Sequence, residues 1–169
     1  GYATITLSSQ NLGSLTIRAG AEFTMSDPSA ALTGSLTVAS GTINVSTSTL
    51  SIAGSLDATA GVMNTASGTI LFNSTDTGET VDPGNNDFYN VVIGSVNGGW
   101  TFQNSTTTNN FILSSANSCN LDTNQRLSVG GVFDNAVGGG ATTWTNSTLS
   151  LQSGTDYSIN NKGSGGDVY

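Results

Sequence analysis

The chain has 169 residues, which is long enough for one domain with a substantial apolar core. It contains 3 Lys and Arg against 11 Asp and Glu, and its net charge of −8 argues against nucleic acid or an anionic membrane as a partner. Only 8% of the residues are charged, so the polarity comes from Ser, Thr and Asn, which is typical of secreted or surface-exposed repeat proteins.

Apolar residues occur mostly as X-apolar-X-apolar pairs, the period of a half-buried β-strand, and helix signals are scarce. In chain order, the clearest pairs are Leu36/Val38, Ile43/Val45, Leu50/Ile52, Leu56/Ala58 and Ile70/Phe72. Most of these pairs lie about seven residues apart. Glycines separate them, where the backbone must turn or approach another segment closely. The sequence therefore predicts short strands joined by tight corners.

The tripeptide Gly-Ser-Leu recurs at Gly13, Gly34 and Gly54, at spacings of 21 and 20 residues. Three strand units fill one such interval, so the chain returns to an equivalent position after about 20 residues. This period is typical of a solenoid whose coils stack on one another. We therefore predict an all-β fold: a single parallel, triangular β-helix (β-solenoid) domain over residues 1–169, with about 20 residues per coil and about eight coils.

A longer repeat overlies the coil period. The stretch "LSIAGSLDA" at residues 50–58 is similar to "LSVGGVFDNA" at residues 127–136, and the segments on either side match in the same order. We expect two long repeats, at approximately residues 11–87 and 88–169, each of about four coils. One supersecondary unit has then been duplicated whole.

The patterns L-x-x-L-x-I at residues 12–17, G-T-x-x-F at 68–72 and L-x-V-x-G-x-F at 127–133 resemble β-helical repeats of large bacterial surface and secreted proteins. These are adhesin-like chains of the filamentous-haemagglutinin type. The resemblance covers most of residues 11–169, and because its motifs are structural it carries over no catalytic residue. It implies a right-handed β-helix on the cell surface or outside the cell. Right-handedness also agrees with the general preference of parallel crossovers.

Neither end of the sequence resembles a polar capping helix, which isolated solenoids need in order to cover their end coils. Uncovered end coils present unpaired backbone groups to another chain. We expect either that copies of this chain stack head to tail into an open filament, or that the sequence belongs to a longer array. The residues expected at the assembly contact lie in the first and last coils: Tyr2, Ile5, Leu7, Tyr157, Ile159, Val168 and Tyr169.

Titratable groups are too scarce to suggest catalysis. The chain has no His, so neither a His-based triad nor an imidazole zinc site can form. Asp57 and Asp134 occupy equivalent places in the two long repeats, which favours a role in turns over a role in one active site. We therefore expect no catalytic residue, no cofactor and no enzymatic activity.

The segment "DTGETVDPGNND" at residues 76–87 is the richest in carboxylates. Pro83-Gly84 interrupts the strand pattern, so we expect a long loop here. Oxygen ligands at such spacing could hold Ca²⁺, although they match neither the EF-hand loop nor the calcium β-roll repeat. A solvated acidic loop is the favoured interpretation. The candidate calcium ligands are Asp76, Glu79, Asp82 and Asp87.

For the single cysteine and the two tryptophans, a structural role is favoured over a reactive or ligand-binding one. Cys119 aligns with Ile43 of the other long repeat, and we expect its side chain to point inward as a small apolar group. Trp100 aligns with Phe23 and is expected in the core. Trp144 and Tyr157 lack such partners, which leaves a surface position open, where aromatic rings can stack on sugars; a structural role is nevertheless the favoured interpretation.

These features favour a structural protein of the cell surface or extracellular space, as a subunit of a filament or adhesin. Its expected partners are copies of itself and, for an adhesin, surface glycans or other cells; no stretch approaches the roughly 20 apolar residues of a membrane span. One alternative is a carbohydrate-binding or carbohydrate-cleaving β-helix, which needs carboxylates in a groove beside an aromatic ring. A less favoured one is an ice-binding solenoid, because the intervals between its T-x-T pairs do not follow the coil period. These pairs lie at residues 4–6, 47–49, 75–77 and 106–108.

Overall fold

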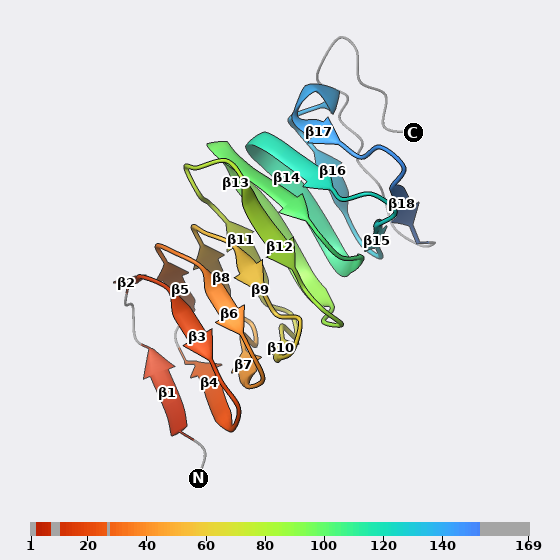
Figure 1. The fold of residues 1–169 in the computed structure, drawn as a ribbon. Coiled ribbons are helices and arrows are strands. Elements are labelled where there is room, and N and C mark those ends of the chain that lie inside the picture. Colours follow the sequence, from red (N-terminus) through yellow and green to blue (C-terminus); the bar gives the residue numbers. More distant parts are fainter. Residues whose placement is uncertain (1–2, 8–10, 27, 153–169) are drawn as a thin grey trace.

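The computed structural model describes residues 3–7, 11–26 and 28–152, with residues 3–7 described as backbone. In this part of the chain, short strands follow one another as a spiral in which every strand pair is parallel. Figure 1 shows the strands stacked along one axis, from the red N-terminal coil to the blue C-terminal one. The predicted parallel β-solenoid is confirmed, with about 20 residues per turn and about 7 turns rather than eight.

The strands lie on three faces, named A, B and C, which the chain visits in this order in each coil. Face A contains β1 (Ala3–Leu7), β4 (Ala21–Met25), β7 (Thr42–Asn44), β10 (Val62–Asn64), the beginning of β14 (Thr106–Leu121), β15 (Arg126–Val129) and β18 (Thr148–Leu151). Face B contains β2 (Asn11–Leu12), β5 (Ser29–Leu32), β8 (Thr49–Ile52), β11 (Thr69–Phe72), the beginning of β13 (Phe88–Phe102), the middle of β14 and β16 (Phe133–Asn135). Face C contains β3 (Leu15–Ile17), β6 (Leu36–Val38), β9 (Leu56–Asp57), β12 (Glu79–Asp82), the ends of β13 and β14, and β17 (Thr142–Thr143).

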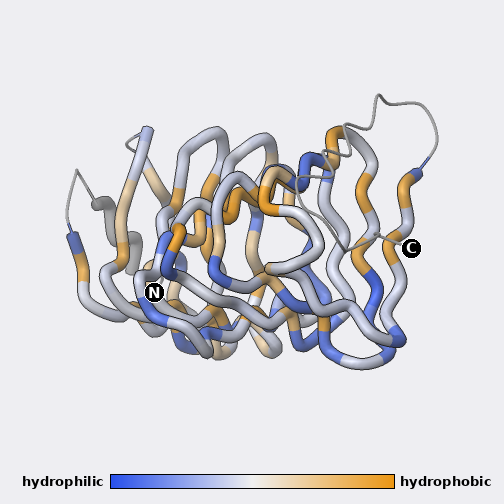
Figure 2. Tube along the Cα trace, turned by 90° about the horizontal axis from the view of Figure 1, so that it is seen from above, coloured by the Kyte–Doolittle hydropathy of each residue, from blue (hydrophilic) through white to orange (hydrophobic). Residues whose placement is uncertain are grey.

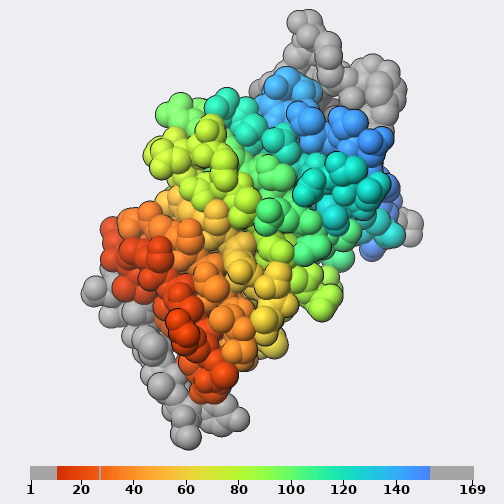
Figure 3. All heavy atoms as spheres, viewed as in Figure 1, coloured from red at the N-terminus to blue at the C-terminus, as the bar shows by residue number. Residues whose placement is uncertain are grey.

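Among the described residues the one helical element is the short 3-10 turn η1 (Gly139–Ala141), which precedes β17. No helix in these ranges has the length and apolar character that a membrane crossing requires. On the visible face in Figure 3, the sequence colours pass in order from red to blue. Each coil therefore contacts the coils before and after it, as expected for a solenoid.

The Gly-Ser-Leu tripeptides lie one above another at the corner between faces B and C. The Ser35 N–H donates to Ser14 Oγ at 3.0 Å, and the Ser55 N–H donates to Ser35 Oγ at 3.1 Å. The leucines that follow point inward, and Leu36 and Leu56 are fully buried. Each tripeptide thus joins neighbouring coils by its serine and fills the core by its leucine.

All ten residues of the predicted strand pairs are at most 1% exposed, so the period-2 pattern located the core correctly. Figure 2 shows hydrophobic residues recurring from coil to coil along the axis. Toward the C-terminus the core becomes aromatic. The ring centroids of Phe72 and Phe102 lie 6.2 Å apart, and contacts of 5.8 to 6.1 Å continue through Phe111 and Phe133 to Trp144. These distances suit favourable ring pairs, so the core is one continuous column.

The matched segments of the longer repeat lie on different faces. Residues 50–52 belong to β8 on face B, whereas the matching residues 127–129 belong to β15 on face A. Similarly, β7 on face A matches the end of β14 on face C. The displacement is therefore three coils and two faces, not four whole coils. All three faces require the same alternation of inward and outward residues, so similar strand sequences can occupy different faces. The longer repeat is therefore a repeat of single strands and their corners, not of whole coils.

Gly54 and Gly13 form a matched pair that tests the need for glycine where coils approach each other. A Cβ on Gly54 would lie 2.7 Å from the carbonyl carbon of Gly34, whereas a Cβ on Gly13 meets no described atom within 4 Å. We expect Gly54→Ala to lower the free energy of unfolding by about 1–3 kcal/mol through overpacking. Gly13→Ala should change it by less than about 0.5 kcal/mol. Urea unfolding of dilute monomeric protein measures both, and equal effects would contradict this explanation.

Candidate functional site

The acidic segment is divided among a loop, a strand and a corner. Asp76 lies on the loop between β11 and β12, Glu79 and Asp82 begin and end β12, and Asp87 precedes β13. The predicted long loop is therefore wrong for β12. The physical reason is Val81, which is fully buried and continues the core column in register with Leu56.

Two of the four candidate calcium ligands bind groups of the solenoid itself. Glu79 Oε2 accepts a hydrogen bond from Ser55 Oγ at 2.5 Å. Asp82 Oδ1 accepts from the Gly84 N–H at 3.0 Å and from Asn104 Nδ2 at 2.7 Å. Within the described ranges, no three or more Asp, Glu, Cys or His side chains gather where a metal ion could bind. The structure therefore does not bring the four candidates into one site.

Asp57 has the turn role that the sequence favours. Its Oδ1 accepts from the Thr59 N–H at 3.1 Å and from Thr59 Oγ1 at 2.8 Å, immediately after β9. Asp134 lies on β16, so the two aspartates occupy different faces. Their equivalence in the sequence is an equivalence of strand units, not of places in the solenoid.

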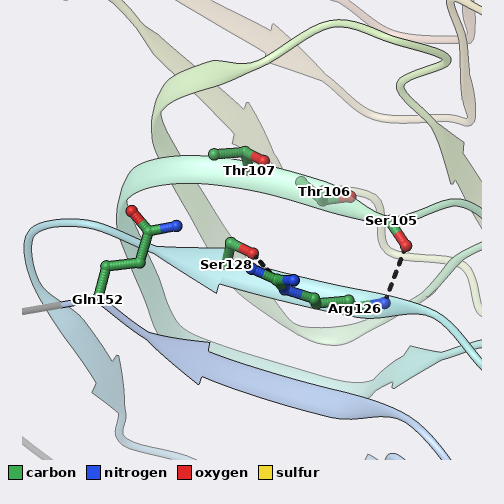
Figure 4. Close-up of a pocket in the computed structure, with 6 residues that line it drawn as sticks. All are labelled: Ser105, Thr106, Thr107, Arg126, Ser128 and Gln152. Atoms are coloured by element: carbon green, nitrogen blue, oxygen red, sulfur yellow. Dashed lines mark hydrogen bonds between the residues drawn. The ribbon is translucent and has the colours of Figure 1, made fainter.

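A pocket with a volume of about 360 Å³ opens on face A near the C-terminal end of the described solenoid (Figure 4). Arg126 Nε donates to Ser128 Oγ at 2.9 Å, and the Arg126 backbone N–H donates to Ser105 Oγ at 3.1 Å. In Figure 4, the Gln152 side chain lies across from this pair. The lining residues are Ser105, Thr106, Thr107, Arg126, Ser128 and Gln152. The sequence reasoning missed this pocket, although Arg126 is one of only 3 basic residues in the chain.

The pocket offers one guanidinium, several hydroxyls and one amide. These are hydrogen-bonding groups for an anion or a sugar hydroxyl. The lining includes neither a carboxylate nor an aromatic ring. Glycoside cleavage needs a pair of carboxyl groups, so this pocket does not provide what the carbohydrate-cleaving alternative requires.

The T-x-T pairs lie in different parts of the solenoid. Residues 4–6 belong to β1, residues 47–49 lead into β8, and residues 75–77 lie on the loop between β11 and β12. At the start of β14, Thr106 and Thr108 are only 1% and 2% exposed. The four pairs therefore do not form the single flat threonine face of an ice-binding solenoid.

Cys119 and Trp100 lie in the core as predicted, at 0% and 1% exposure. Burial raises the pKa of the Cys119 thiol to about 12, so the thiol stays protonated near neutral pH. Trp144 is half-buried: its ring packs on Phe133, and its Nε1 donates to the Cys119 carbonyl oxygen at 2.9 Å. Both partners are core residues, so packing explains Trp144 better than surface stacking; Tyr157 lies outside the described residues.

The first coil presents open strand edges. β1, β2 and β3 are the end strands of their sheets and pair on one side only within the described part of the chain. The Gly34 N–H donates to the Gly13 carbonyl oxygen at 2.9 Å, and the Ser35 N–H donates to Ser14 Oγ at 3.0 Å. By the same geometry, the N–H groups of Gly13 and Ser14 face the open side. At the other end, β16, β17 and β18 likewise pair on one side only among the described residues.

Few of the predicted assembly residues can be placed. Ile5 and Leu7 lie on β1, in register with Phe23 and Met25, which are both buried. The other predicted residues fall outside the described ranges: Tyr2, Tyr157, Ile159, Val168 and Tyr169.

Comparison of the chain with protein-family models, with curated proteins and with solved structures finds no match. The β-solenoid fold thus stands on the structure itself. The likeness to filamentous-haemagglutinin-type adhesins stays a prediction from the sequence motifs.

The raised pKa of Cys119 predicts a specific loss of stability at high pH. Folding raises this pKa from 9.0 to about 12, so the thiolate forms first in the unfolded chain. The stabilising contribution is complete below pH 9 and is lost as the pH rises from 9 toward 12. The free energy of unfolding should fall in this range more steeply than in Cys119→Val, by up to about 1.4 kcal/mol per pH unit. Urea unfolding at pH 8 to pH 11 measures it, and parallel pH profiles would refute the prediction.

Proposed function

We propose that this chain is a structural β-solenoid that stacks end to end with copies of itself, as a subunit of a filament or adhesin stem outside the cell. The observation that carries the proposal is Gly13. It repeats Gly34 and Gly54, where a Cβ would collide with the preceding coil, yet at Gly13 no described atom lies within 4 Å of that position. The first coil thus has the glycine that a neighbouring coil requires.

The apolar side chains of the end coils support the same proposal. Leu15 is half-buried, whereas its equivalents Leu36 and Leu56 in the next two coils are fully buried. Likewise, Leu149 is half-buried and its equivalent Leu127 is fully buried. A further coil on either end would cover these side chains, and burial of apolar surface stabilises by about 25 cal/mol per Å².

The corner between faces B and C allows coils to stack without strong repulsion. At this corner, outward side chains of successive coils lie in register and form one column, in which each residue carries a hydroxyl or an amide. Within it, the Thr80 N–H donates to Ser55 Oγ at 3.0 Å and the Thr143 N–H donates to Asn120 Oδ1 at 2.9 Å. Such groups pair with their own kind, whereas a column of like charges would be destabilising. The column is Ser14, Ser35, Ser55, Thr80, Thr101, Asn120 and Thr143.

The non-enzymatic role fits how the carboxylates are used. The side chains of Asp57, Glu79 and Asp82 bind neighbouring groups of the solenoid. The remaining polar pocket at Arg126 could accept an anion or sugar, which is compatible with an adhesive surface.

Gly13→Arg tests end-to-end stacking, with Ser40→Arg as its matched control. Ser40 is exposed at a corner of the next coil, away from the open edge, and receives the same added charge. We expect the wild type to form linear assemblies as its concentration rises. Gly13→Arg should raise the concentration needed at least tenfold, which corresponds to about 1.4 kcal/mol. Ser40→Arg should assemble like the wild type.

Sedimentation velocity and negative-stain electron microscopy read out the assembly of the three proteins. Urea unfolding of Gly13→Arg checks that its fold is intact. A wild type that stays monomeric at every concentration, or equal assembly of the two variants, would contradict the proposal.

A further inference from the structure

Face B differs from the other two faces because its outward positions carry no charge over five successive coils. The carboxylates of the neighbouring faces lie elsewhere: Glu22 is on face A, and Asp57, Glu79 and Asp82 are on face C. On face B itself, Asp134 lies on β16, beyond the charge-free coils. We name this surface the neutral face. Its outward residues are Ser29, Ala31, Thr49, Ser51, Thr69, Leu71, Asn90, Val92, Asn110 and Ile112.

The polar column of the neutral face satisfies its own hydrogen bonds. Asn110 Nδ2 donates to Asn90 Oδ1 at 2.7 Å, and Asn90 Nδ2 donates to Thr69 Oγ1 at 3.3 Å. These bonds run along the solenoid axis, between residues that are in register in neighbouring coils. Stacked amides of this kind are typical of sheets that pack closely against another sheet.

The second column of the neutral face is apolar in its middle. Leu71, Val92 and Ile112 are in register on three successive coils and are all partly exposed. Ala31 and Ser51 continue the column with small side chains. Removing water from this surface costs little free energy, because one column is apolar and the amides of the other already bond to each other. The surface is therefore suited to burial against an uncharged partner.

The distribution of charge allows a second copy of this chain to be that partner, because this face carries no carboxylate over five coils. Each copy carries a net charge of −8, so two copies repel each other when carboxylates meet. A contact between two neutral faces keeps the carboxylates of faces A and C away from the interface. Over these five coils the apolar columns can meet across the interface without desolvating a charge, and Asp134, in register with Ile112 on the next coil, marks the end of each contact.

The area of the neutral face decides which assembly can use it. Four strand residues span about 13 Å and five coils span about 24 Å, so one copy offers roughly 300 Å². A stable pair of proteins usually buries about 800 Å² on each partner, so two single chains would not pair tightly. In a filament, every added subunit contributes the same area again, and the contact grows with length.

We propose that the neutral face is the lateral contact by which filaments of this chain lie side by side, neutral face against neutral face. This inference rests on the proposed end-to-end stacking. Because the attraction is apolar and the opposing term is the repulsion of carboxylates outside the contact, added salt should increase bundling.

Val92→Glu and Thr101→Glu form the matched test. Both residues point outward from β13 in the same coil, but Val92 lies on the neutral face and Thr101 on face C. We expect wild-type and Thr101→Glu filaments to bundle, and Val92→Glu filaments to stay single. The double variant Val92→Thr/Ile112→Thr keeps β-branched residues and adds no charge. It therefore tests the contact even if the glutamate of Val92→Glu disturbs folding, and it should also give single filaments.

Electron microscopy of each protein at 50 mM and 500 mM NaCl measures filament length and bundle width separately. Filaments of Val92→Glu and of the threonine double variant that bundle as the wild type does would overturn the lateral contact and leave end-to-end stacking intact. Loss of bundling in Thr101→Glu to the same degree as in Val92→Glu would also overturn it. Failure of the wild type to form filaments would overturn both proposals together.

Discussion

The in-register parallel pairing of each coil with the coil before it is the constraint on which this structure depends. Residues about 20 positions apart lie directly above one another, as Ser35 and Ser55 do. Each position must therefore tolerate its own kind as a neighbour: apolar residues inside, hydroxyls and amides outside, and glycine where the backbones approach. The low content of charged residues, 8%, is a direct consequence, because stacked like charges repel. The few exceptions, such as the in-register Asp57 and Asp82, engage hydrogen-bond donors at their own corners.

The sequence predicts the coil well because its signals are local. The pairs Leu50/Ile52 and Ile70/Phe72 show the period of a half-buried strand, and the spacing of Gly34 and Gly54 gives the coil length. The inward position of Cys119 followed from its alignment with Ile43, which is also buried. Local signals cannot show on which face a strand lies, because that depends on the summed lengths of all preceding corners.

The loop between β11 and β12 illustrates this limit. Its extra residues place Thr80 25 positions after Ser55, where other coils use about 20. The acidic segment also contains a strand, β12, whose Val81 is buried and which the Pro83-Gly84 corner concealed. The pocket at Arg126 was equally hidden, because its lining residues come from successive coils and share no sequence motif. The neutral face also emerges only when outward residues of five coils are placed in register.

The backbone and side-chain contacts that join successive coils within the chain could equally join a coil of one copy to a coil of another copy. Many β-proteins protect their edge strands with charges, prolines or bulges. In the first described coil, Gly13 and Ser14 repeat the residues used for coil-to-coil contact further along. Stacking and lateral contact would then use different surfaces: the coil edges along the axis and the neutral face across it.

Cryo-electron microscopy of the assembled protein tests end-to-end stacking most directly. The predicted result is a fibre in which the coil spacing of about 4.8 Å continues without interruption across each junction, with a rise of roughly 34 Å per subunit of about 7 turns. Subunits joined through their sides, with the edges of β1, β2 and β3 left open, would contradict the proposal.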